Sequence, residues 1–598
     1  MREDGALFFL LDMLHCLSYT SAESRQTMAS KTRPWWQTTV FYQIYPRSFA
    51  DGNGDGIGDF PGILSKLDYL QSLGIGAIWL SPHFPSPNVD CGYDVADYVN
   101  VAPEYGTLDD FKRFLHEAHA RGIRVLLDLV LNHTSDQHPW FIESRSSRDN
   151  PKRDWYVWRD PAPDGGPPNN WWSVFGGSAW TFDTHTGQYY YHFFFKEQPD
   201  LNWRNPAVKE AMWEAVRFWL DMGVDGFRLD AIGTIYEDPA MPNHQGKLSQ
   251  LDVLRAWREN LPAEQMQQLT AAMMETFRYQ FGQPEVHTLM KELRALLDTY
   301  PGDRVLIGED DDIAYYGNGN DELHLVFNFP LMRTNRITPA FVRANQAERL
   351  SKLPPGAWPC NTLGNHDVSR MRTAFGDGEH DLAIARVNAA LVLTLKGTPV
   401  LYNGEEIGMT DLILSRLDQL RDNQAINAYH AAIADGATPE EALALAARIS
   451  RDRCRTPMQW ANAPNAGFSP EGVTTWLPVN PNYAEGINVA EQEHDPDSLL
   501  NYYRRLIRVR QRTPALYQGE YAPVDEAEEY FAFTRRDPES GQACLVVLNM
   551  SAEPVATSLP TAERARCIFS SHGREGRGIA PRHLHLAPFE VLIAELEA

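Results

Sequence analysis

The sequence predicts an α/β protein built around a (β/α)8 TIM barrel, with a small domain inserted after the third barrel strand and an all-β domain at the C-terminus. Three observations lead to this prediction. Short apolar runs alternate with amphipathic helical segments, which is the pattern of consecutive β-α-β units. The run at residues 124–131 is almost continuously apolar, as expected for a strand buried on both faces of a parallel sheet. From residue 517 onward, short alternating strands replace the helices.

Eight segments are predicted to be barrel strands because β-branched, aromatic and other apolar residues dominate them. They are residues 40–45, 76–80, 124–131, 223–232, 304–308, 325–329, 360–363 and 399–402. Helices are predicted at residues 63–74, 109–121, 206–222, 286–300 and 498–512. Eight strands with intervening helices fit a barrel in which acids at the C-terminal strand ends meet at one mouth.

Two segments interrupt this alternation. Residues 133–204 are rich in Trp, Pro and Gly and are predicted to be the inserted domain. Residues 409–450 are predicted to be a helical insertion within the barrel domain, whose second helix begins with a capping box from Thr438 to Glu441. The predicted domains are therefore an N-terminal extension or leader at 1–33, the barrel at 34–132 and 205–515, the insertion at 133–204, and a β-sandwich-like domain at 516–598.

Length and charge limit the classes of function. A chain of 598 residues is too long for one small core. Its formal net charge of −25, from 54 basic and 79 acidic residues, argues against binding to nucleic acid or to an anionic membrane surface. Sixteen Trp and 24 Tyr fit either a large core or a cleft whose rings stack on sugars. We expect a protein that acts on small molecules, as a monomer or homodimer.

The cysteines and the N-terminus indicate the compartment. The six Cys are scattered without a CxxC pair, which favours free thiols in a reducing compartment and hence the cytoplasm. Residues 6–14 form an apolar run like that of a signal peptide, but Asp12 interrupts it and it is too short to span a membrane. Residues 1–27 are therefore either a poor leader, which would mean secretion, or an extension upstream of Met28.

Four acids are placed at the ends of predicted barrel strands: Asp128, Asp230, Glu309 and Asp367. Within GFRLD, Arg228 and Asp230 are two residues apart, so they face the same side of a strand. A buried structural ion pair would explain that pair alone. Several acids at one barrel mouth instead suit hydrolysis of an acetal, which needs one carboxylate at the sugar and one protonated acid at the leaving oxygen.

These segments resemble the α-amylase family, glycoside hydrolase family 13, and within it the α-glucosidase and oligo-1,6-glucosidase group. The matching runs are DLVLNH (128–133), GFRLD (226–230), IGE (307–309) and GNHD (364–367), together with QIYPRSF, CGYD and RTPMQW. The resemblance extends from about residue 34 to the C-terminus. Four such runs in this order, each at a strand end, are far more specific than any one of them.

The resemblance implies a role for each matching residue. Asp230 would be the nucleophile, Glu309 the acid and then the base, and Asp367 the residue that binds the sugar hydroxyls and stabilises the transition state. Arg228 would keep Asp230 ionised, and Asp128 would support the site without reacting. The remaining substrate-binding residues would be Asp90, Tyr93, His133, Phe175, Phe194, His366, Arg451 and Arg455. For Tyr93, Phe175 and Phe194, packing in the core is an equally simple explanation.

The loop DGNGDGIGD places Asp51, Asn53, Asp55 and Asp59 at alternating positions, a pattern of hard oxygen ligands that suits Ca²⁺ or Mg²⁺. It lacks the bidentate Glu of an EF-hand, because Gly62 stands at that position. In the resembling group this loop binds a divalent cation, and Ile57 would add its carbonyl. The alternative is a turn rich in Asp and Asn with no metal. We expect a structural cation and no organic cofactor.

The function expected from the resemblance is an exo-acting, retaining α-glucosidase acting on short α-glucosides. Ala231 follows the nucleophile, and in the resembling group Ala or Thr there goes with α-1,4 preference and Val with α-1,6. One alternative is a glucosyl transferase or isomerase, such as a trehalose synthase or sucrose isomerase, or a sucrose or trehalose hydrolase. The RLDRD-like loop of sucrose isomerases is absent. A non-catalytic barrel like the transporter heavy chains would lack the full set of acids.

Overall fold

The structure of the protein is a computed structural model that describes residues 33–248 and 263–597. The predicted leader at residues 1–27 and Cys16 lie outside the described residues. The described residues from Trp36 onward form one compact unit. The five described cysteines are free and buried, in agreement with the expected lack of a disulfide framework among them.

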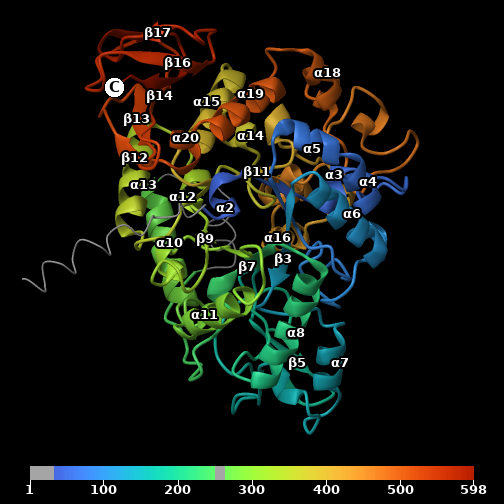
Figure 1. Ribbon diagram of the computed structural model, residues 1–598. Coiled ribbons are helices and arrows are strands. Elements are labelled where there is room, and N and C mark those ends of the chain that lie inside the picture. Colours follow the sequence, from blue (N-terminus) through green and yellow to red (C-terminus); the bar gives the residue numbers. More distant parts are fainter. Residues whose placement is uncertain (1–32, 249–262, 598) are drawn as a thin grey trace, which may run out of the picture. The chain divides into compact units, whose positions relative to one another are not determined.

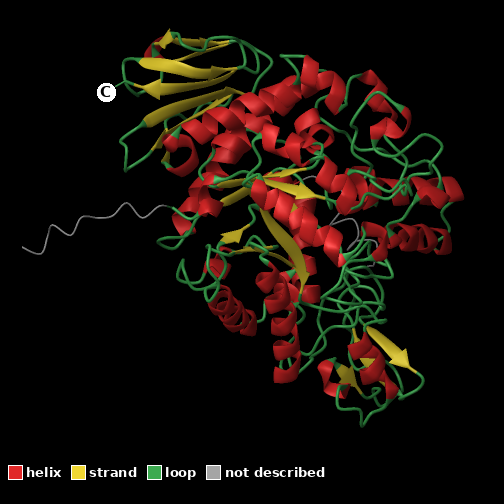
Figure 2. Ribbon diagram, turned by 45° about the vertical axis from the view of Figure 1, so that its right-hand side comes forward, coloured by secondary structure: helices red, strands yellow, loops and turns green. Residues whose placement is uncertain are grey.

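An eight-stranded parallel sheet forms the barrel, and every predicted barrel strand is present (Figure 2). The strands are β1 (Phe41–Ile44), β2 (Ala77–Leu80), β3 (Arg124–Val130), β7 (Gly226–Asp230), β8 (Val305–Gly308), β9 (Leu325–Val326), β10 (Cys360–Thr362) and β11 (Thr398–Tyr402). Their order is β10-β11-β1-β2-β3-β7-β8-β9. A parallel bridge between Phe327 and Cys360 joins the two edges, so the sheet is nearly closed.

The packing of neighbouring strands explains one glycine of the GFRLD run. Gly226 begins β7 with φ of +153°, and a Cβ added there would lie 2.1 Å from the carbonyl oxygen of Val305 on β8. Only glycine allows this close approach. The register then pairs Arg228 with Asp128 on β3 and with Ile307 on β8, which brings the acidic ends of three strands together.

Four helices of the barrel domain begin and end close to the predicted positions: α6 (Leu108–Ala120), α8 (Pro206–Met222), α11 (Glu285–Leu297) and α19 (Leu499–Arg512). The structure adds α15 (Asp381–Thr394), which was not predicted. Thr107 caps α6 through a capping box, and Gly223 ends α8 in the left-handed conformation.

The first predicted helix, at residues 63–74, differs from the structure. It forms two helices, α4 (Phe60–Ser65) and α5 (Leu67–Leu73), separated at Lys66. The helical segment begins early because the side chain of Asp59 accepts the N–H of Gly62 as an N-cap. Ile63, Leu67 and the following apolar residues are buried on either side of the break, so burial of the apolar face is preserved.

The segment after the third strand folds as a small antiparallel sheet of β4 (Trp158–Arg159), β6 (Gln188–Tyr191) and β5 (Trp180–Asp183). A bridge between His133 and Asp200 holds its two ends together beside the barrel. Its aromatic cluster also includes Phe277, the last residue of α10 (Ala263–Phe277). The barrel and this segment are therefore packed together through α10.

The insertion after β11 contains two helices, α16 (Asn423–Ala434) and α17 (Pro439–Ile449). Thr438 and Glu441 form the predicted capping box of α17. Asp422 caps α16 by accepting the N–H of Gln424. Ala425 and Ala428 of α16 pack in one cluster with Ala446 and Ile449 of α17, and Tyr45 after β1 belongs to the same cluster.

The C-terminal part is all-β and antiparallel, as predicted (Figure 1). One sheet has the order β12-β13-β14-β19-β16-β17 and the other pairs β15 with β18. The bounds are β12 (Glu520–Pro523), β13 (Tyr530–Arg536), β14 (Ala543–Asn549), β15 (Val555–Thr557), β16 (Ala565–Ser570), β17 (Gly578–Ile579), β18 (Leu584–Leu586) and β19 (Val591–Leu596). Alternate residues of β14 face different clusters: Val546 joins the barrel cluster, and Leu545 packs with Leu584 and Leu586.

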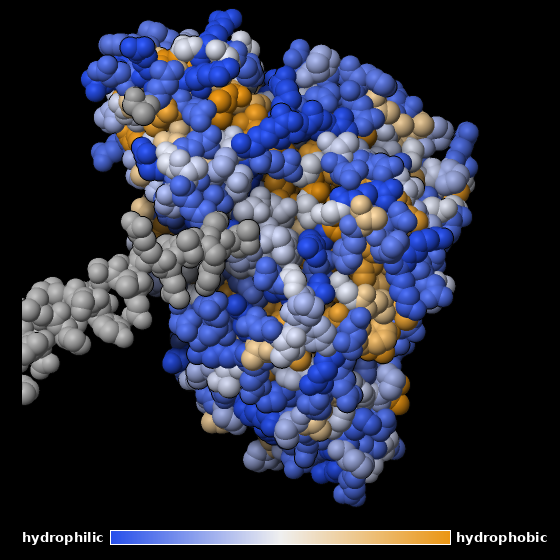
Figure 3. Space-filling view, in the orientation of Figure 1, coloured by the Kyte–Doolittle hydropathy of each residue, from blue (hydrophilic) through white to orange (hydrophobic). Residues whose placement is uncertain are grey.

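The face in Figure 3 is mostly hydrophilic, with apolar residues scattered among charged ones. Within residues 33–248 and 263–597, no helix is both long and apolar enough to cross a membrane.

Candidate active site

Arg228 is the centre of the site. Its Nη1 lies 2.6 Å from Oδ1 of Asp128 and 2.7 Å from Oδ1 of Asp230, and its Nη2 lies 2.7 Å from Oε2 of Glu309. The guanidinium is 1% exposed, whereas the side chain of Glu309 is 21% exposed. One buried cation therefore orients three carboxylates from the ends of three neighbouring strands, and Glu309 is the most open of them.

Asp128 is held entirely by the protein. Besides Arg228, its carboxylate accepts Nε1–H of Trp79 at 3.1 Å and the hydroxyl of Tyr93 at 3.1 Å. It is fully buried, so no surface remains for a substrate. These contacts agree with a supporting role for Asp128, which keeps Arg228 and Tyr93 in place.

Asp367 is paired with a different cation. Oδ1 of Asp367 accepts Nη2–H of Arg455 at 2.7 Å, and Nε of Arg455 also donates to the backbone oxygen of His366 at 2.8 Å. Nε2 of His366 lies 3.4 Å from Oδ2 of Asp367 and 2.7 Å from the hydroxyl of Tyr93. His366 thus connects the group around Asp367 to the group around Asp128 through Tyr93.

A third buried cation, Arg451, joins the loop after β2 to the helical insertion. Nη2 of Arg451 lies 2.7 Å from Oδ1 of Asp90 and 2.8 Å from Oδ1 of Asp422. Nη1 of the same guanidinium is 3.7 Å from Oδ1 of Asp367. The other oxygen of Asp90 accepts Nε2–H of Gln198, whose nitrogen is also 2.9 Å from Nε2 of His133. The predicted residues Asp90, His133 and Arg451 therefore form one network.

The predicted aromatic residues lie beside this network. The ring centroid of Phe194 is 5.1 Å from that of His133, and Phe175 is 5.5 Å from both Phe194 and the guanidinium of Arg451. Both phenylalanines are partly exposed. Tyr93 is 5% exposed and is stacked on His366. Its ring packs mainly against protein, whereas Phe175 and Phe194 have open surface for a ligand.

The charges of the site follow from burial. Burial raises the pKa of Asp128 to about 6 and also raises the pKa of Asp230, and in both cases Arg228 opposes the shift. Because one guanidinium faces three carboxylates, the cluster retains a proton more tightly than separate carboxyls would. Burial lowers the pKa of His133 to about 4 and that of His366 well below its usual value, so both imidazoles are neutral at pH 7.

The family model described as "Alpha amylase, catalytic domain" matches residues 43–519. An oligo-1,6-glucosidase of Parageobacillus thermoglucosidasius is 40% identical over 548 residues, covering 88% of this chain and 92% of that protein. The chain belongs to the α-amylase family. The resemblance inferred from the sequence motifs is thereby confirmed, and so is the barrel fold.

Other relatives of this α-amylase-family chain include transferring as well as hydrolytic enzymes. A probable α-glucosidase of Rhizobium meliloti (strain 1021) is 41% identical, covering 90% of this chain and 94% of that protein. The solved trehalulose synthase MutB from Pseudomonas mesoacidophila MX-45 has a TM-score of 0.83 at 39% identity, covering 95% of this chain and all of that chain. The α-glucosyl transfer enzyme XgtA has a TM-score of 0.81 at 39% identity, with 95% and 100% coverage.

Four contact residues of the site were not predicted from the sequence: Gln43, Gln198, Asp422 and Trp79, which lies on β2 and donates to Asp128. Gln198 and Asp422 lie in the two insertions, where no strand-end pattern marks them. Gln43 binds Nδ1 of His366 at 2.7 Å and is the first residue of the QIYPRSF run, so that motif could have identified it. All of the predicted catalytic and substrate-binding residues lie in the connected groups described above.

The loop from Asp51 to Asp59 is closed by its own side chains. Asp51 accepts the N–H groups of Gly54 and Gly56, Asn53 accepts that of Asp55, and Asp55 accepts that of Ile57, over 2.6–2.9 Å. These are the contacts of a turn rich in Asp and Asn. Each carboxylate oxygen can accept more than one bond, so the oxygen-rich donor set still fits a hard cation. Among the described residues, no group of three or more His, Cys, Asp or Glu side chains is arranged to hold a metal ion.

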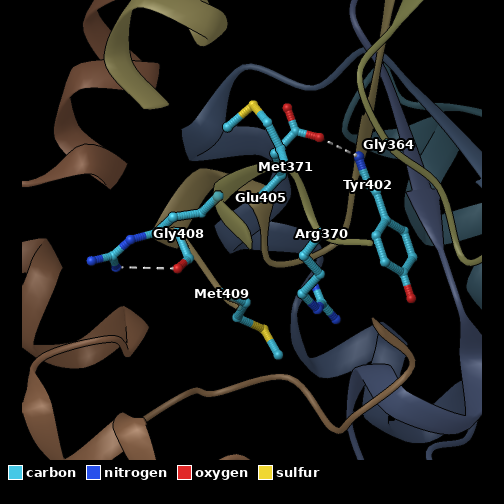
Figure 4. Close-up of a pocket in the computed structure, with 8 residues that line it drawn as sticks. Gly364, Arg370, Met371, Tyr402, Glu405, Gly408 and Met409 are labelled. Atoms are coloured by element: carbon cyan, nitrogen blue, oxygen red, sulfur yellow. Dashed lines mark hydrogen bonds between the residues drawn. The ribbon is translucent and has the colours of Figure 1, made fainter. Parts of the chain in front are cut away.

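A small cavity that contains none of the predicted catalytic acids lies next to the Asp367 loop (Figure 4). It is lined by Gly364, Arg370, Met371, Arg372, Tyr402, Glu405, Gly408 and Met409. Glu405 accepts the hydroxyl of Tyr503 at 3.1 Å, and burial raises the pKa of its carboxyl to about 7. This cavity is lined mainly by segments that follow β10 and β11, and the candidate active site is the group around Arg228.

Proposed function

We propose that this α-amylase-family protein is an exo-acting, retaining α-glucosidase that releases glucose from the non-reducing end of short α-glucosides. The observation that carries the proposal is the position of Asp230 and Glu309 at the two terminal nitrogens of one guanidinium. Two carboxyl groups held that close suit the retaining geometry, with a separation of ~5 Å, better than the wider inverting geometry. The identities of the relatives support the same class of reaction.

In the first step, Asp230 attacks the anomeric carbon and Glu309 protonates the oxygen of the leaving sugar. Burial raises the pKa of Asp230, and the ion pair with Arg228 opposes that shift by favouring the carboxylate. The same ion pair fixes one oxygen of Asp230, so the other oxygen is free to form the glycosyl bond. In the second step, Glu309 takes a proton from water, which hydrolyses the glycosyl-enzyme and restores both carboxyl groups.

The remaining residues would bind the terminal glucose. Asp367 would accept hydroxyl hydrogen bonds and stabilise the positive charge that develops on the sugar. His133 and His366, which are neutral at pH 7 and almost fully buried, would shape this pocket without placing a cation beside that charge. The ion pair between Asp90 and Arg451 joins two loops next to Asp367 and would close the pocket beyond a single sugar, which is what exo action requires.

A second candidate function is transfer of the glucosyl group, or isomerisation of sucrose. The solved relatives with this fold include a trehalulose synthase and an α-glucosyl transfer enzyme. Both reactions use the same glycosyl-enzyme and differ in whether water or a sugar accepts the glucose. Chromatography of the products from maltose, isomaltose, sucrose and trehalose separates them, because a transferase makes new disaccharides where a hydrolase makes glucose.

Three further properties are part of the proposal. The oxygen-rich loop at residues 51–59 would hold one Ca²⁺ or Mg²⁺ as a structural ion through Asp51, Asn53, Asp55, Ile57 and Asp59. Five free, buried cysteines favour a cytoplasmic location. The protein would work as a monomer or homodimer, which size-exclusion chromatography with light scattering would decide.

The experiment that tests the mechanism is proton NMR of the first-formed product. Wild-type protein acting on an α-glucoside should release α-glucose before mutarotation. Release of the β-anomer would contradict the retaining mechanism, and absence of glucose from every α-glucoside tested would contradict the proposed function.

A further inference from the structure

Phe281 has an unusual place for an exposed aromatic residue. Its side chain is 47% exposed, yet its ring lies directly on the backbone of Gly233. A Cβ added to Gly233 would lie 2.5 Å from Cζ of Phe281 and 3.0 Å from Oδ2 of Asp310. Gly233 follows Asp230 by three residues, and Asp310 follows Glu309 directly. The ring and the Asp310 carboxylate therefore lie close together at the ends of β7 and β8, the strands that position Asp230 and Glu309.

The segment that carries Phe281 is fixed from both sides. The N–H of Gly282 donates to the carbonyl oxygen of Gly233 at 2.7 Å, which anchors it to the barrel. Nε2 of Gln280 donates to the backbone oxygen of Trp172 at 2.9 Å and to the hydroxyl of Tyr191 at 3.0 Å, which anchors it to the inserted domain. A ring held by its backbone in this way costs little entropy when a ligand stacks on it.

Asp310 supplies a polar group beside the ring. Its Oδ1 accepts the N–H groups of Asp311 and Asp312 at 2.8 and 2.9 Å, which fixes the carboxylate. Among the described residues, Oδ2 has no hydrogen-bond partner and faces Gly233 and Phe281. An apolar ring with one adjacent acceptor suits a pyranose, which has an apolar face and hydroxyl groups around its edge.

We propose that Phe281 and Asp310 form the subsite for the second sugar, the one that leaves in hydrolysis and accepts in transfer. Phe281 stacks on that sugar, and Asp310 accepts one of its hydroxyl groups. This inference rests on the proposed function, because it places the second sugar beyond the bond that Asp230 and Glu309 cleave. It assigns a purpose to Asp310, the acid directly after Glu309, which the catalytic mechanism does not use.

The test compares two donors that differ only in the leaving group. Maltose places a glucose in the proposed subsite, whereas α-glucosyl fluoride releases fluoride and leaves the subsite empty. Phe281→Ala should lower kcat/KM for maltose by about tenfold, the scale of one lost apolar contact, and leave kcat/KM for α-glucosyl fluoride within about twofold. Phe281→Trp should restore most of the activity on maltose. Phe182→Ala, which removes a phenylalanine of similar exposure from β5, is the matched control and should change neither.

Transfer provides an independent readout. With α-glucosyl fluoride as donor and added maltose as acceptor, Phe281→Ala should lower the ratio of transfer to hydrolysis. Asp310→Asn should act in the same direction and leave hydrolysis of the fluoride unchanged. If either variant lowers activity on both donors equally, that residue acts through the catalytic groups and its part of the inference is wrong. If wild-type protein cleaves no α-glucoside, the proposed function has failed instead.

Discussion

The ion pair between Nη1 of Arg228 and Oδ1 of Asp230, at 2.7 Å within a buried site, controls the charge of the proposed nucleophile. Burial favours the neutral carboxyl and Arg228 favours the carboxylate. The same guanidinium also holds Asp128 and Glu309, so one cation balances several acids. Changes to any member of this cluster are expected to alter the chemistry more than the fold.

Asp230→Asn is expected to lower kcat by about three orders of magnitude or more, because the amide cannot form the glycosyl-enzyme. The fold should remain, since Asn keeps a hydrogen-bond acceptor for Arg228 and two carboxylates still balance the guanidinium. Activity on p-nitrophenyl α-glucoside and the melting temperature would be measured together. Asp109→Asn, at an exposed position on α6, is the control. A loss of only a few fold would place the nucleophile elsewhere.

Removal of divalent metal is expected to lower the melting temperature more than it lowers the rate at temperatures where the protein stays folded. An ion that binds only the folded state stabilises it by mass action, so a chelator removes that contribution. Asp55→Ala should melt at the same temperature with and without chelator. Asp55 is the appropriate site because it is exposed, whereas Asp59 also caps α4 and would destabilise the helix regardless of metal. If the chelator does not change the melting temperature of wild type and no ion copurifies, the loop is only a turn.

Glu405 is expected to make stability depend on pH. Burial raises the pKa of its carboxyl from 4.5 to about 7 in the folded protein. Protonation therefore favours the folded state, and this contribution is present below pH 4.5 and is lost as pH rises through about 7. Glu405→Gln should raise the free energy of unfolding at pH 8 by about 1–3 kcal/mol and change it little near pH 4.5.

Thermal melts of Glu405→Gln across this pH range would measure that effect. Glu214→Gln, at an exposed position on α8, is the matched control and should follow wild type at every pH. A variant that melts below wild type at pH 8 would show that the carboxylate is stabilised in the interior, against the direction expected from its burial.

The sequence was sufficient to predict the barrel because strands that are buried on both faces must be almost entirely apolar. The run at β8 is apolar until Glu309 follows its end, and the run at β3 carries Asp128 two residues before its end, so strand and site were visible together. Contacts between distant segments had no such local pattern. Gln43 and His366 are 323 residues apart, and Asp422 reaches Arg451 only because α16 and α17 pack as a pair. The break at Lys66 was hidden because both halves of the helix bury the same apolar face.

The last prediction concerns linkage preference and Ala231. Its backbone N–H donates to Oε2 of Glu309 at 2.9 Å, so this residue lies between the proposed nucleophile and the proposed acid. The small side chain leaves room for the acceptor sugar. We therefore expect maltose to be preferred over isomaltose by about tenfold to a few hundredfold, because one methyl-scale contact is worth about 1–3 kcal/mol. Several relatives are named oligo-1,6-glucosidases. A preference for maltose would therefore distinguish this chain from them, and a preference for isomaltose would group it with them.

The measurement is the ratio of kcat/KM for maltose to that for isomaltose, in wild type, Ala231→Val and Ala231→Thr. Ala231 has φ of 41° and ψ of 47°, a left-handed conformation in which any β-branched residue is strained. Thr has nearly the shape of Val and carries the same strain, so it is the matched control. We expect Val to shift the ratio toward isomaltose. If Thr leaves the ratio near wild type, side-chain polarity rather than size sets the linkage. If Thr shifts the ratio as far as Val, side-chain size sets the linkage. If wild type already prefers isomaltose, or if Val leaves the ratio unchanged, Ala231 does not set the linkage preference. Contacts with the second sugar must then set it.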